Sequence, residues 1–309
     1  MNPAPAHQAA RPATGHPPWI AIASGKGGTG KTSVAVSLAL AAVQAGKRVQ
    51  LIDADVEGPN AHHFLDLGAS AETTIRSMLP VIAPETCTGC GACVEFCTFH
   101  ALAAAGNKVI VFPDLCHACE GCREVCPVGA ITDGAQEIGV IRHWQRGPLS
   151  VCQGALQIGQ VLSPALIRAL HRRGRGEAED SAGRPPDVDL TIVDAPPGTA
   201  CAMMAAIRGA DHLLLVTEPT PFGRHDLDLA MQAAATLRLP VEVIINRSND
   251  HDRVIEDLCR ARAVPIVARL PESRQVAEAY AEGRPMGSLG PPWATTFTNL
   301  VTHLEGLWA

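Results

Sequence analysis

Short apolar runs alternate with stretches of helical spacing along most of the chain. The run that begins at Trp19 ends at a glycine-rich loop, and residues 32–46 then show the hydrophobic spacing of a helix. Helical stretches also separate further β-rich runs, each of which has polar residues at its carboxyl end: residues 48–56, 189–198, 212–220 and 241–249. This alternation predicts a doubly wound α/β fold, with a mainly parallel sheet covered by helices on both faces.

Ligands of such sheets bind beyond the carboxyl ends of the strands. The polar residues expected at that edge are Gly25 to Thr32, Asp53, Asp55, Asp194 to Gly198, and Asn246. We therefore expect the ligand site there.

Three other segments have clear patterns. Residues 1–18 predict a disordered tail, and the Gly- and Pro-rich residues 171–187 predict a long surface loop. Apolar residues recur at helical spacing near the C-terminus: Trp293, Phe297, Leu300, Val301, Leu304 and Trp308. A packing helix is favoured over a membrane-surface helix, because Glu305 is the only charged residue after Arg284 and a lipid-binding basic face is missing.

Composition narrows the class of protein. The chain has 309 residues, 47% of them hydrophobic, and a net charge of −6, which gives no general attraction to nucleic acid or anionic lipid. No run approaches the ~18 apolar residues of a membrane span, and the first eighteen residues lack the apolar core of a secretory signal. We expect a cytoplasmic protein with no stable membrane anchor and no nucleic-acid partner.

The segment GKGGTGKT satisfies the pattern GxxxxGK[ST] between a predicted strand and a predicted helix. Small residues let backbone N–H groups face phosphate oxygens, and the helix N-terminus adds a favourable partial charge. Lys31 is expected to reach the β and γ phosphates and Thr32 to bind Mg²⁺. The predicted nucleotide-binding residues of this loop are Gly25, Lys26, Gly27, Gly28, Thr29, Gly30, Lys31, Thr32 and Ser33.

A second lysine, Lys26, follows the first glycine of this loop. The form KGGxGK[ST] resembles the deviant Walker A motif of the MinD, ParA, Mrp and nitrogenase iron protein superfamily. The resemblance implies that Lys26 contacts nucleotide phosphate across a dimer interface, formed with a second copy or a paralogue. An inert surface lysine is the alternative.

Two acidic segments extend the resemblance. LIDADVEGPN is similar to switch I, which implies that Asp55 positions the attacking water and that Asp53 lies closer to the metal. IVDAPPGT is similar to the Walker B and switch II segment of the Mrp branch, which implies Asp194 in the Mg²⁺ shell and Gly198 near the γ-phosphate. The implied reaction is slow, partner-stimulated ATP hydrolysis that uses Lys26, Lys31, Asp55 and Asp194.

The resemblance also implies a site for the adenine base. Asn246, at the end of VIIN, matches the family position that reads the base. Residues 269–285, which include Pro271, resemble the segment that covers it.

Eight of the eleven cysteines lie between Cys87 and Cys126, and clustered thiols without a secretory signal indicate metal binding. They form two CxxCxxCxxxC sets, a spacing that places three thiolates on one cluster and sends the fourth to the other. The spacing predicts one [4Fe-4S] cluster on Cys87, Cys90, Cys93 and Cys126, and a second on Cys116, Cys119, Cys122 and Cys97. Zinc is the alternative, although zinc ribbons pair CxxC motifs across a longer gap.

Residues 84–134 resemble a bacterial two-cluster ferredoxin module, inserted between ATPase segments 19–83 and 135–309. Cys126 is followed by proline, as the pattern expects, whereas Cys97 is followed by Thr98. The combination resembles MinD-superfamily ATPases that contain an inserted small α+β ferredoxin domain.

Three isolated cysteines remain, and core packing is the default for each because free cysteine is usually buried. Cys259 fits a helix interior. Cys201 follows Asp194 at a spacing similar to that of a cluster ligand in the nitrogenase iron protein, and Cys152 is the candidate second ligand. The alternative for this pair is therefore a third cluster shared by two subunits.

We expect an ATP-gated electron carrier that serves a redox or iron-sulfur protein partner. One alternative is an iron-sulfur cluster carrier of the Mrp type, although no CxxC follows Cys126. Another is a positioning ATPase like MinD or ParA with redox-sensing clusters, against which the acidic charge and the missing basic C-terminal helix argue.

Overall fold

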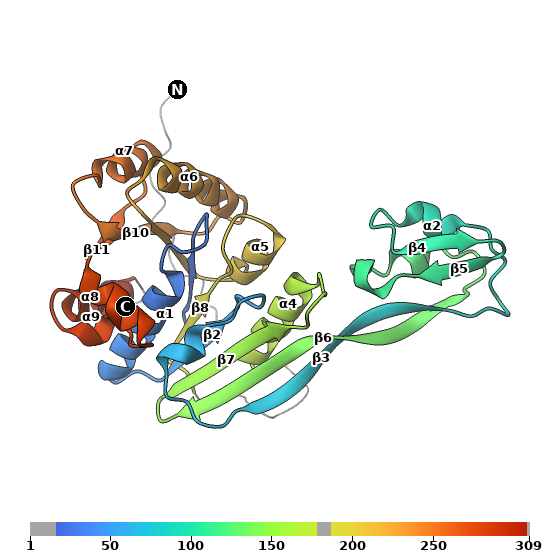
Figure 1. The fold of residues 1–309 in the computed structure, drawn as a ribbon, viewed down its shortest axis with the longest axis horizontal. Helices are drawn as coiled ribbons and strands as arrows, with labels where there is room; N and C mark the ends of the chain where they lie inside the picture. Colours follow the sequence, from blue (N-terminus) through green and yellow to red (C-terminus); the bar gives the residue numbers. More distant parts are fainter. Residues whose placement is uncertain (1–16, 178–186, 308–309) are drawn as a thin grey trace.

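The computed structural model describes residues 17–177 and 187–307. Within these residues one sheet contains seven parallel strands: β1 (Trp19–Ala23), β2 (Val49–Asp53), β7 (Leu149–Leu156), β8 (Leu190–Asp194), β9 (His212–Thr217), β10 (Val241–Ser248) and β11 (Ile266–Pro271). Two antiparallel strands complete it, β3 (Ala71–Ile82) and β6 (Ile131–Arg146), in the order β11-β10-β9-β1-β8-β2-β7-β6-β3. The prediction of a mainly parallel α/β sheet is confirmed (Figure 1).

Helices cover both faces of the sheet. Successive side chains of each buried strand point to opposite sides, so both faces carry apolar residues that helices must cover. Trp19, Ala21 and Ala23 of β1 join one core cluster, whereas Ile20 and Ile22 join the other. The first cluster packs against α4 (Ser163–Gly174), α5 (Cys201–Ile207), α6 (Pro221–Thr236) and α7 (Arg253–Arg262). The second packs against α1 (Lys31–Gln44), η1 (Ala61–Phe64), α8 (Arg274–Ala281), η3 (Met286–Leu289) and α9 (Trp293–Gly306).

The C-terminal helix packs into the core. Trp293, Phe297, Leu300, Val301 and Leu304 are buried in the cluster that α9 shares with α1, which confirms the prediction of a packing helix. Trp308 and residues 1–16 of the expected tail lie outside the described residues. No helix in the described part of the chain is long and apolar enough to cross a membrane.

The prediction of a loop from residue 171 is wrong at its start. Helix α4 continues to Gly174, and His171 and Arg173 are buried. The His171 ring packs edge-on against the Trp19 ring, with 5.1 Å between their centroids. Packing against the core therefore extends the helix into a segment whose local composition favours a loop. Residues 178–186 lie outside the described part of the chain.

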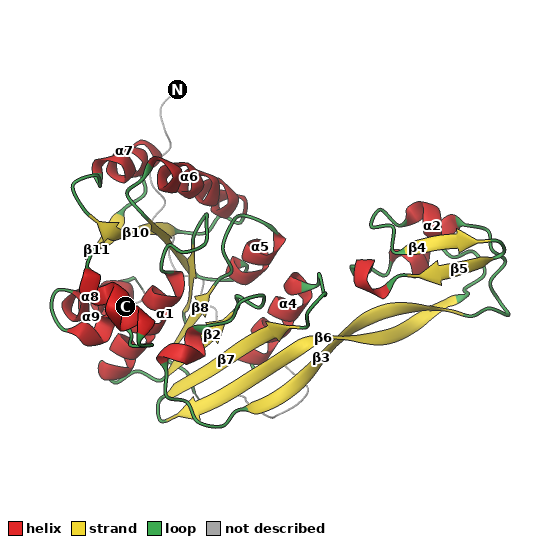
Figure 2. Cartoon of the chain, in the orientation of Figure 1, coloured by secondary structure: helices red, strands yellow, loops and turns green. Residues whose placement is uncertain are grey.

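A long antiparallel ribbon connects the sheet to the cysteine-rich residues. Strands β3 and β6 pair from Ala71 opposite His143 to Ile82 opposite Ile131. The ribbon carries residues 83–130, here called the cysteine unit, at its far end (Figure 2). The unit contains α2 (Ala92–Phe96), β4 (Leu102–Ala105), β5 (Lys108–Val111), η2 (Pro113–Leu115) and α3 (Gly121–Glu124). The sequence pattern did not reveal the ribbon, whose strands begin before residue 84 and continue past residue 134.

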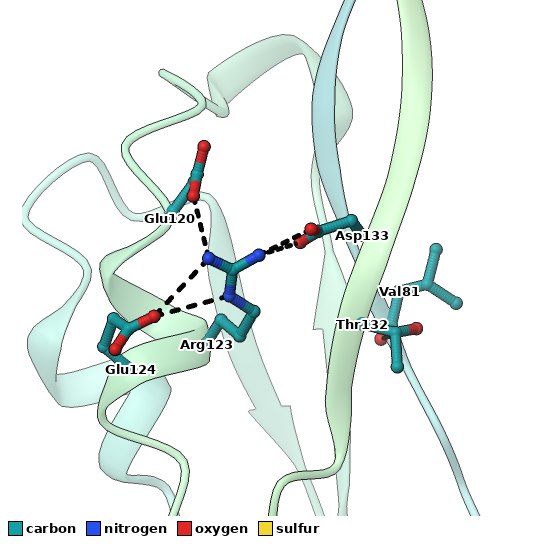
Figure 3. Close-up of polar contacts among 6 residues, drawn as sticks. All are labelled: Val81, Glu120, Arg123, Glu124, Thr132 and Asp133. Atoms are coloured by element: carbon teal, nitrogen blue, oxygen red, sulfur yellow. Dashed lines mark hydrogen bonds and ion pairs between the residues drawn. The ribbon is translucent and has the colours of Figure 1, made fainter.

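One arginine attaches the cysteine unit to the ribbon. The guanidinium of Arg123, on α3, donates to the Asp133 carboxylate of β6 across 2.7 Å (Figure 3). Glu120 and Glu124 pair with the same guanidinium. These ion pairs lie at the surface, so the main contribution of Arg123 is to orient α3 on the strand rather than to stabilise the fold strongly.

Candidate functional site

The predicted phosphate loop connects β1 to α1. Gly28 and Gly30 have φ angles of 77° and 93°, a left-handed conformation that glycine adopts without steric cost. Gly198 also has a positive φ, and its N–H donates to the Ser24 carbonyl across 3.1 Å. The predicted Walker B segment therefore lies directly beside the phosphate loop.

Lys31 and two carboxylates lie together at the carboxyl edge of the sheet. Asp53 and Asp194 are register partners at the ends of β2 and β8, and both are fully buried. Lys31 is 6% exposed. Burial lowers the pKa of its ammonium group, and the carboxylates of Asp194, Asp55 and Asp53 oppose that shift. The sheet topology thus brings together three residues that the sequence separates widely.

Asp194 is suited to bind a hard cation. Burial raises the pKa of its carboxyl well above the usual range, and the neighbouring Asp53 raises it further. Neither carboxylate oxygen accepts a hydrogen bond of good geometry from a described residue, although the Thr32 hydroxyl lies close enough to oppose the rise in pKa. Mg²⁺ prefers such oxygen ligands, so Asp194 and Thr32 fit the predicted metal site.

Asp53 has a structural role that the sequence did not reveal. Its Oδ2 atom accepts hydrogen bonds from the backbone N–H groups of Asn60 and Ala61, at 2.9 and 3.0 Å. Burial raises the pKa of Asp53 to about 7, and these hydrogen bonds oppose the rise. Asp53 therefore anchors the segment that follows Asp55. Asp55 itself is half-buried, and burial raises the pKa of its carboxyl, although the nearby Lys31 charge opposes the rise.

Asn246 contacts the phosphate loop directly. Its Nδ2 atom donates to the Thr29 carbonyl across 2.7 Å, and the residue is buried. The side chain predicted to read the adenine base therefore also holds the loop backbone. Pro271, predicted to lie near the base, ends the neighbouring strand β11 and is exposed.

Lys26 pairs with a residue that the sequence analysis missed. The Lys26 ammonium lies 3.1 Å from the carboxylate of Glu218, which follows β9. The two residues are 192 positions apart, so no local sequence signal reveals the pair.

The eight clustered cysteines line two pockets in the cysteine unit. Cys87, Cys90, Cys93 and Cys126 line one, together with apolar residues that include Ile82 and Ile131 at the end of the ribbon. Cys97, Cys116, Cys119 and Cys122 line the other, together with Met78 and Pro80 of β3. Each pocket thus takes three cysteines from one set and the last cysteine of the other. No group of three His, Cys, Asp or Glu side chains in the described residues is arranged to hold a single metal ion.

The three isolated cysteines, for which core packing was the default prediction, differ in their burial. Cys152 lies on β7 with 0% of its surface exposed, within the core beneath α4, and burial raises its pKa to about 12. A thiol enclosed in this way is not presented to a second subunit. Cys201 is exposed at the start of α5, so the default prediction of core packing is wrong for this residue. Cys259 is buried on α7, as predicted.

A family model described as the CobQ/CobB/MinD/ParA nucleotide binding domain matches residues 20–286. The chain belongs to this family. It is therefore a P-loop ATPase of the MinD/ParA/Mrp type, as the motifs predicted. The matched range spans the cysteine unit, but the family's description names only a nucleotide binding domain.

Two proteins of Methanocaldococcus jannaschii are similar to this MinD/ParA-type ATPase. An uncharacterized protein, MJ0579, is 29% identical over 85% of this chain and 89% of its own length. A second, MJ0578, is 32% identical over 67% of this chain and 70% of its own length. An iron-sulfur cluster carrier protein of Rickettsia conorii is 23% identical over 87% of this chain and 66% of its own length.

Among solved structures, the cell division ATPase MinD of Pyrococcus furiosus matches with a TM-score of 0.57 and 22% identity, over 94% of this chain and 99% of that one. MinD of Pyrococcus horikoshii, solved with Mg-ADP, matches with a TM-score of 0.57 and 19% identity, over 94% and 97% of the two chains. At this identity the likeness shows a shared fold.

Proposed function

We propose that this ATPase carries two [4Fe-4S] clusters and that its nucleotide state gates electron transfer through them to a protein partner. The division of the eight clustered cysteines between two pockets is the main support for this proposal. Cys97 lines the pocket of the second set and Cys126 that of the first, which is the interleaved ligation typical of two-cluster ferredoxins. Such clusters take up and release single electrons.

The residues around the thiols fit such clusters. The two pockets are lined mainly by apolar side chains besides the cysteines. The Ala118 N–H donates to the Cys116 Sγ atom at 3.4 Å, and the Ala130 N–H donates to the Cys126 Sγ atom at 3.3 Å. Hydrogen bonds to cluster sulfurs and exclusion of water both set reduction potentials, so these residues would tune the two sites.

Helix α4 supports the coupling between nucleotide and clusters. Two residues after Asp55, the Glu57 carboxylate accepts a hydrogen bond from the Ser163 hydroxyl at the start of α4, across 2.6 Å. On the same helix, the Arg173 guanidinium donates to the Thr73 hydroxyl of β3 across 3.0 Å. Switch I, α4 and the ribbon therefore form a continuous series of contacts toward the cysteine unit.

In the ATPase site, each of this chain's residues has a distinct role in the proposal. Lys31 and the loop N–H groups bind and neutralise the phosphates, Asp194 and Thr32 hold Mg²⁺, and Asp55 orients water. Lys26 acts on a second copy or a paralogue. None of the described residues at the site is a strong base, so hydrolysis is slow until a partner orients the water.

An anaerobic measurement tests the proposal. Protein reconstituted without oxygen is expected to contain about eight irons and eight sulfides per chain, as two [4Fe-4S] clusters require. The reduction potential or oxidation rate of the reduced protein should differ between ATP, ADP and a non-hydrolysable analogue. Equal values in all three nucleotides would show that nucleotide does not gate the clusters, and stoichiometric zinc in place of iron would exclude electron transfer.

The relatives support a second candidate, an iron-sulfur cluster carrier. Besides the Rickettsia protein, a Synechocystis protein of that name is 56% identical over 52 residues, which are 17% of this chain and 15% of its own length. In this case the clusters should move intact to an apo-ferredoxin, with an ATP-dependent rate. Retention of all iron during such an incubation would favour the electron carrier.

A further inference from the structure

Glu218 lies between two cations beside the phosphate loop. Its Oε2 atom is 3.1 Å from the Lys26 ammonium, and its Oε1 atom accepts from the Arg247 guanidinium at 2.6 Å. The Glu218 side chain is only 10% exposed, compared with 33% for Lys26 and 56% for Arg247. The carboxylate is thus enclosed, while both cations reach solvent.

The enclosure determines what happens when Lys26 moves. A nearly buried carboxylate that loses its only cation is strongly destabilised, because desolvation is no longer offset by an opposite charge. Glu218 avoids this cost, since Arg247 remains on the other carboxylate oxygen. Lys26 can therefore leave Glu218 without leaving a buried charge unpaired.

Local backbone structure helps to hold Arg247 where it pairs with Glu218. Arg247 has a φ of 54°, which is unusual for a residue with a side chain, and it lies at an irregularity in the pairing of β10 with β11. The side-chain amide of Asn249 donates to the Arg247 carbonyl across 3.0 Å. A strained conformation that neighbouring contacts maintain is typical of functional positions.

The main chain of the phosphate loop is already fixed against the Glu218 segment. A Cβ atom at Gly25 would stand 2.1 Å from the carbonyl oxygen of Asp226, on the helix that follows Glu218. The loop backbone therefore has little room to move toward α6. Release of Lys26 needs only a rotation of its long side chain.

We propose that Glu218 is a positioning residue that holds Lys26 within its own protomer and releases it to the nucleotide phosphate of a second copy, while Arg247 keeps the carboxylate paired. This inference rests on the proposed function, in which Lys26 acts across a dimer interface. Glu218 then sets the ATP concentration at which the dimer forms, because the partner's phosphate must compete with it for Lys26.

Two substitutions should act in opposite directions. Glu218→Gln removes the charge that holds Lys26, so the ATP concentration for half-maximal dimerisation should fall about tenfold, a typical size for coupling between linked sites. Arg247→Ala leaves Lys26 as the partner of Glu218, so that concentration should rise by a similar factor. Analytical ultracentrifugation over a Mg-ATP titration measures both.

Asp228→Asn is the matched control, because Asp228 forms a similar 2.6 Å ion pair with Arg262 away from the loop. This control should dimerise as the wild type does. Thermal unfolding checks that each variant is folded. Arg247 is more than half exposed, so its variant keeps the test valid if Glu218→Gln unfolds.

Shifts of the two variants in the same direction, or shifts below twofold in both, would overturn the inference. Lys26→Ala separates this failure from that of the proposed function. If Lys26→Ala dimerises with ATP as the wild type does, Lys26 has no role across an interface, so both the role that the proposed function gives to Lys26 and the role of Glu218 fail. If Lys26→Ala abolishes dimerisation while the other two variants behave as the wild type, only the role of Glu218 fails.

Discussion

A Cβ atom at Gly30 would stand only 2.4 Å from the Nδ2 atom of Asn246. The same amide donates to the carbonyl of Thr29, immediately before Gly30. Gly30 immediately precedes α1, whereas Asn246 lies on β10. The contact therefore fixes the phosphate loop, which connects β1 to α1, against a strand from another part of the chain. The direction of the loop N–H groups therefore depends on a residue far away in the sequence.

Asn246→Ala should weaken nucleotide binding. The substitution removes the buried donor to the Thr29 carbonyl, a loss that costs about 1–3 kcal/mol when the acceptor stays unpaired. We expect the Kd for Mg-ATP, measured by isothermal titration calorimetry, to rise roughly tenfold or more. Asn299→Ala, at an exposed position of α9, is the control and should bind normally. An unchanged Kd for Asn246→Ala would contradict a role of this contact in holding the loop.

Asp194→Asn should separate stability from activity. Because burial raises the pKa of Asp194, the folded chain holds this proton more tightly than the unfolded chain. The nucleotide-free wild type therefore loses stability as the pH rises from about 4, the usual pKa of an Asp, toward the folded pKa. The Asn variant lacks this loss, so its Tm in EDTA should exceed that of the wild type at pH 8, by roughly 2–4 °C per kcal/mol relieved.

The same variant should lose ATP hydrolysis, because the carboxylate that fits Mg²⁺ is gone. Rates at saturating Mg-ATP are expected to fall at least about 100-fold. The Tm difference should shrink as the pH is lowered to 4. A variant less stable than the wild type at every pH would show that burial does not strain this carboxylate.

Single cysteine variants test the interleaved ligation. Cys97→Ser and Cys126→Ser each remove one thiolate from a different pocket, so each should lower the iron content from about eight toward about four per chain. Electron paramagnetic resonance of the reduced variants should show a different remaining cluster in each case. Cys201→Ser, at an exposed site outside both pockets, should keep all the iron. If both variants lose the same cluster signal, the ligand assignment is wrong.

Ser163→Ala tests the contact between the predicted switch I segment and α4. The variant loses the hydrogen bond to Glu57, which is the direct side-chain link between the segment after Asp55 and the helix. We expect the difference in cluster oxidation rate between ATP and ADP to fall at least about threefold, while ATP hydrolysis changes by less than twofold. Ser288→Ala, in η3, provides a control with no expected effect. Full retention of the nucleotide effect would exclude this route.

Local patterns predicted much of the fold and part of the site. The glycines and lysines of residues 25–32 identify a phosphate loop because their chemistry is contiguous, and the apolar runs around Asp53 and Asp194 identify buried strands. The cysteine spacing likewise predicted how the thiols divide, since three cysteines of each pocket lie within a few residues of each other. These features need little information from distant parts of the chain.

Tertiary structure decided the rest. The β3–β6 ribbon, the helical conformation of His171 and the burial of Cys152 follow from packing against distant elements. Glu218 and Asn246 reach the phosphate loop only because β9 and β10 lie on the same side of β1 in the sheet. The sequence by itself determined which chemical groups this protein contains and how its neighbouring residues fold. The order of strands in the sheet decided which distant side chains meet at the phosphate loop.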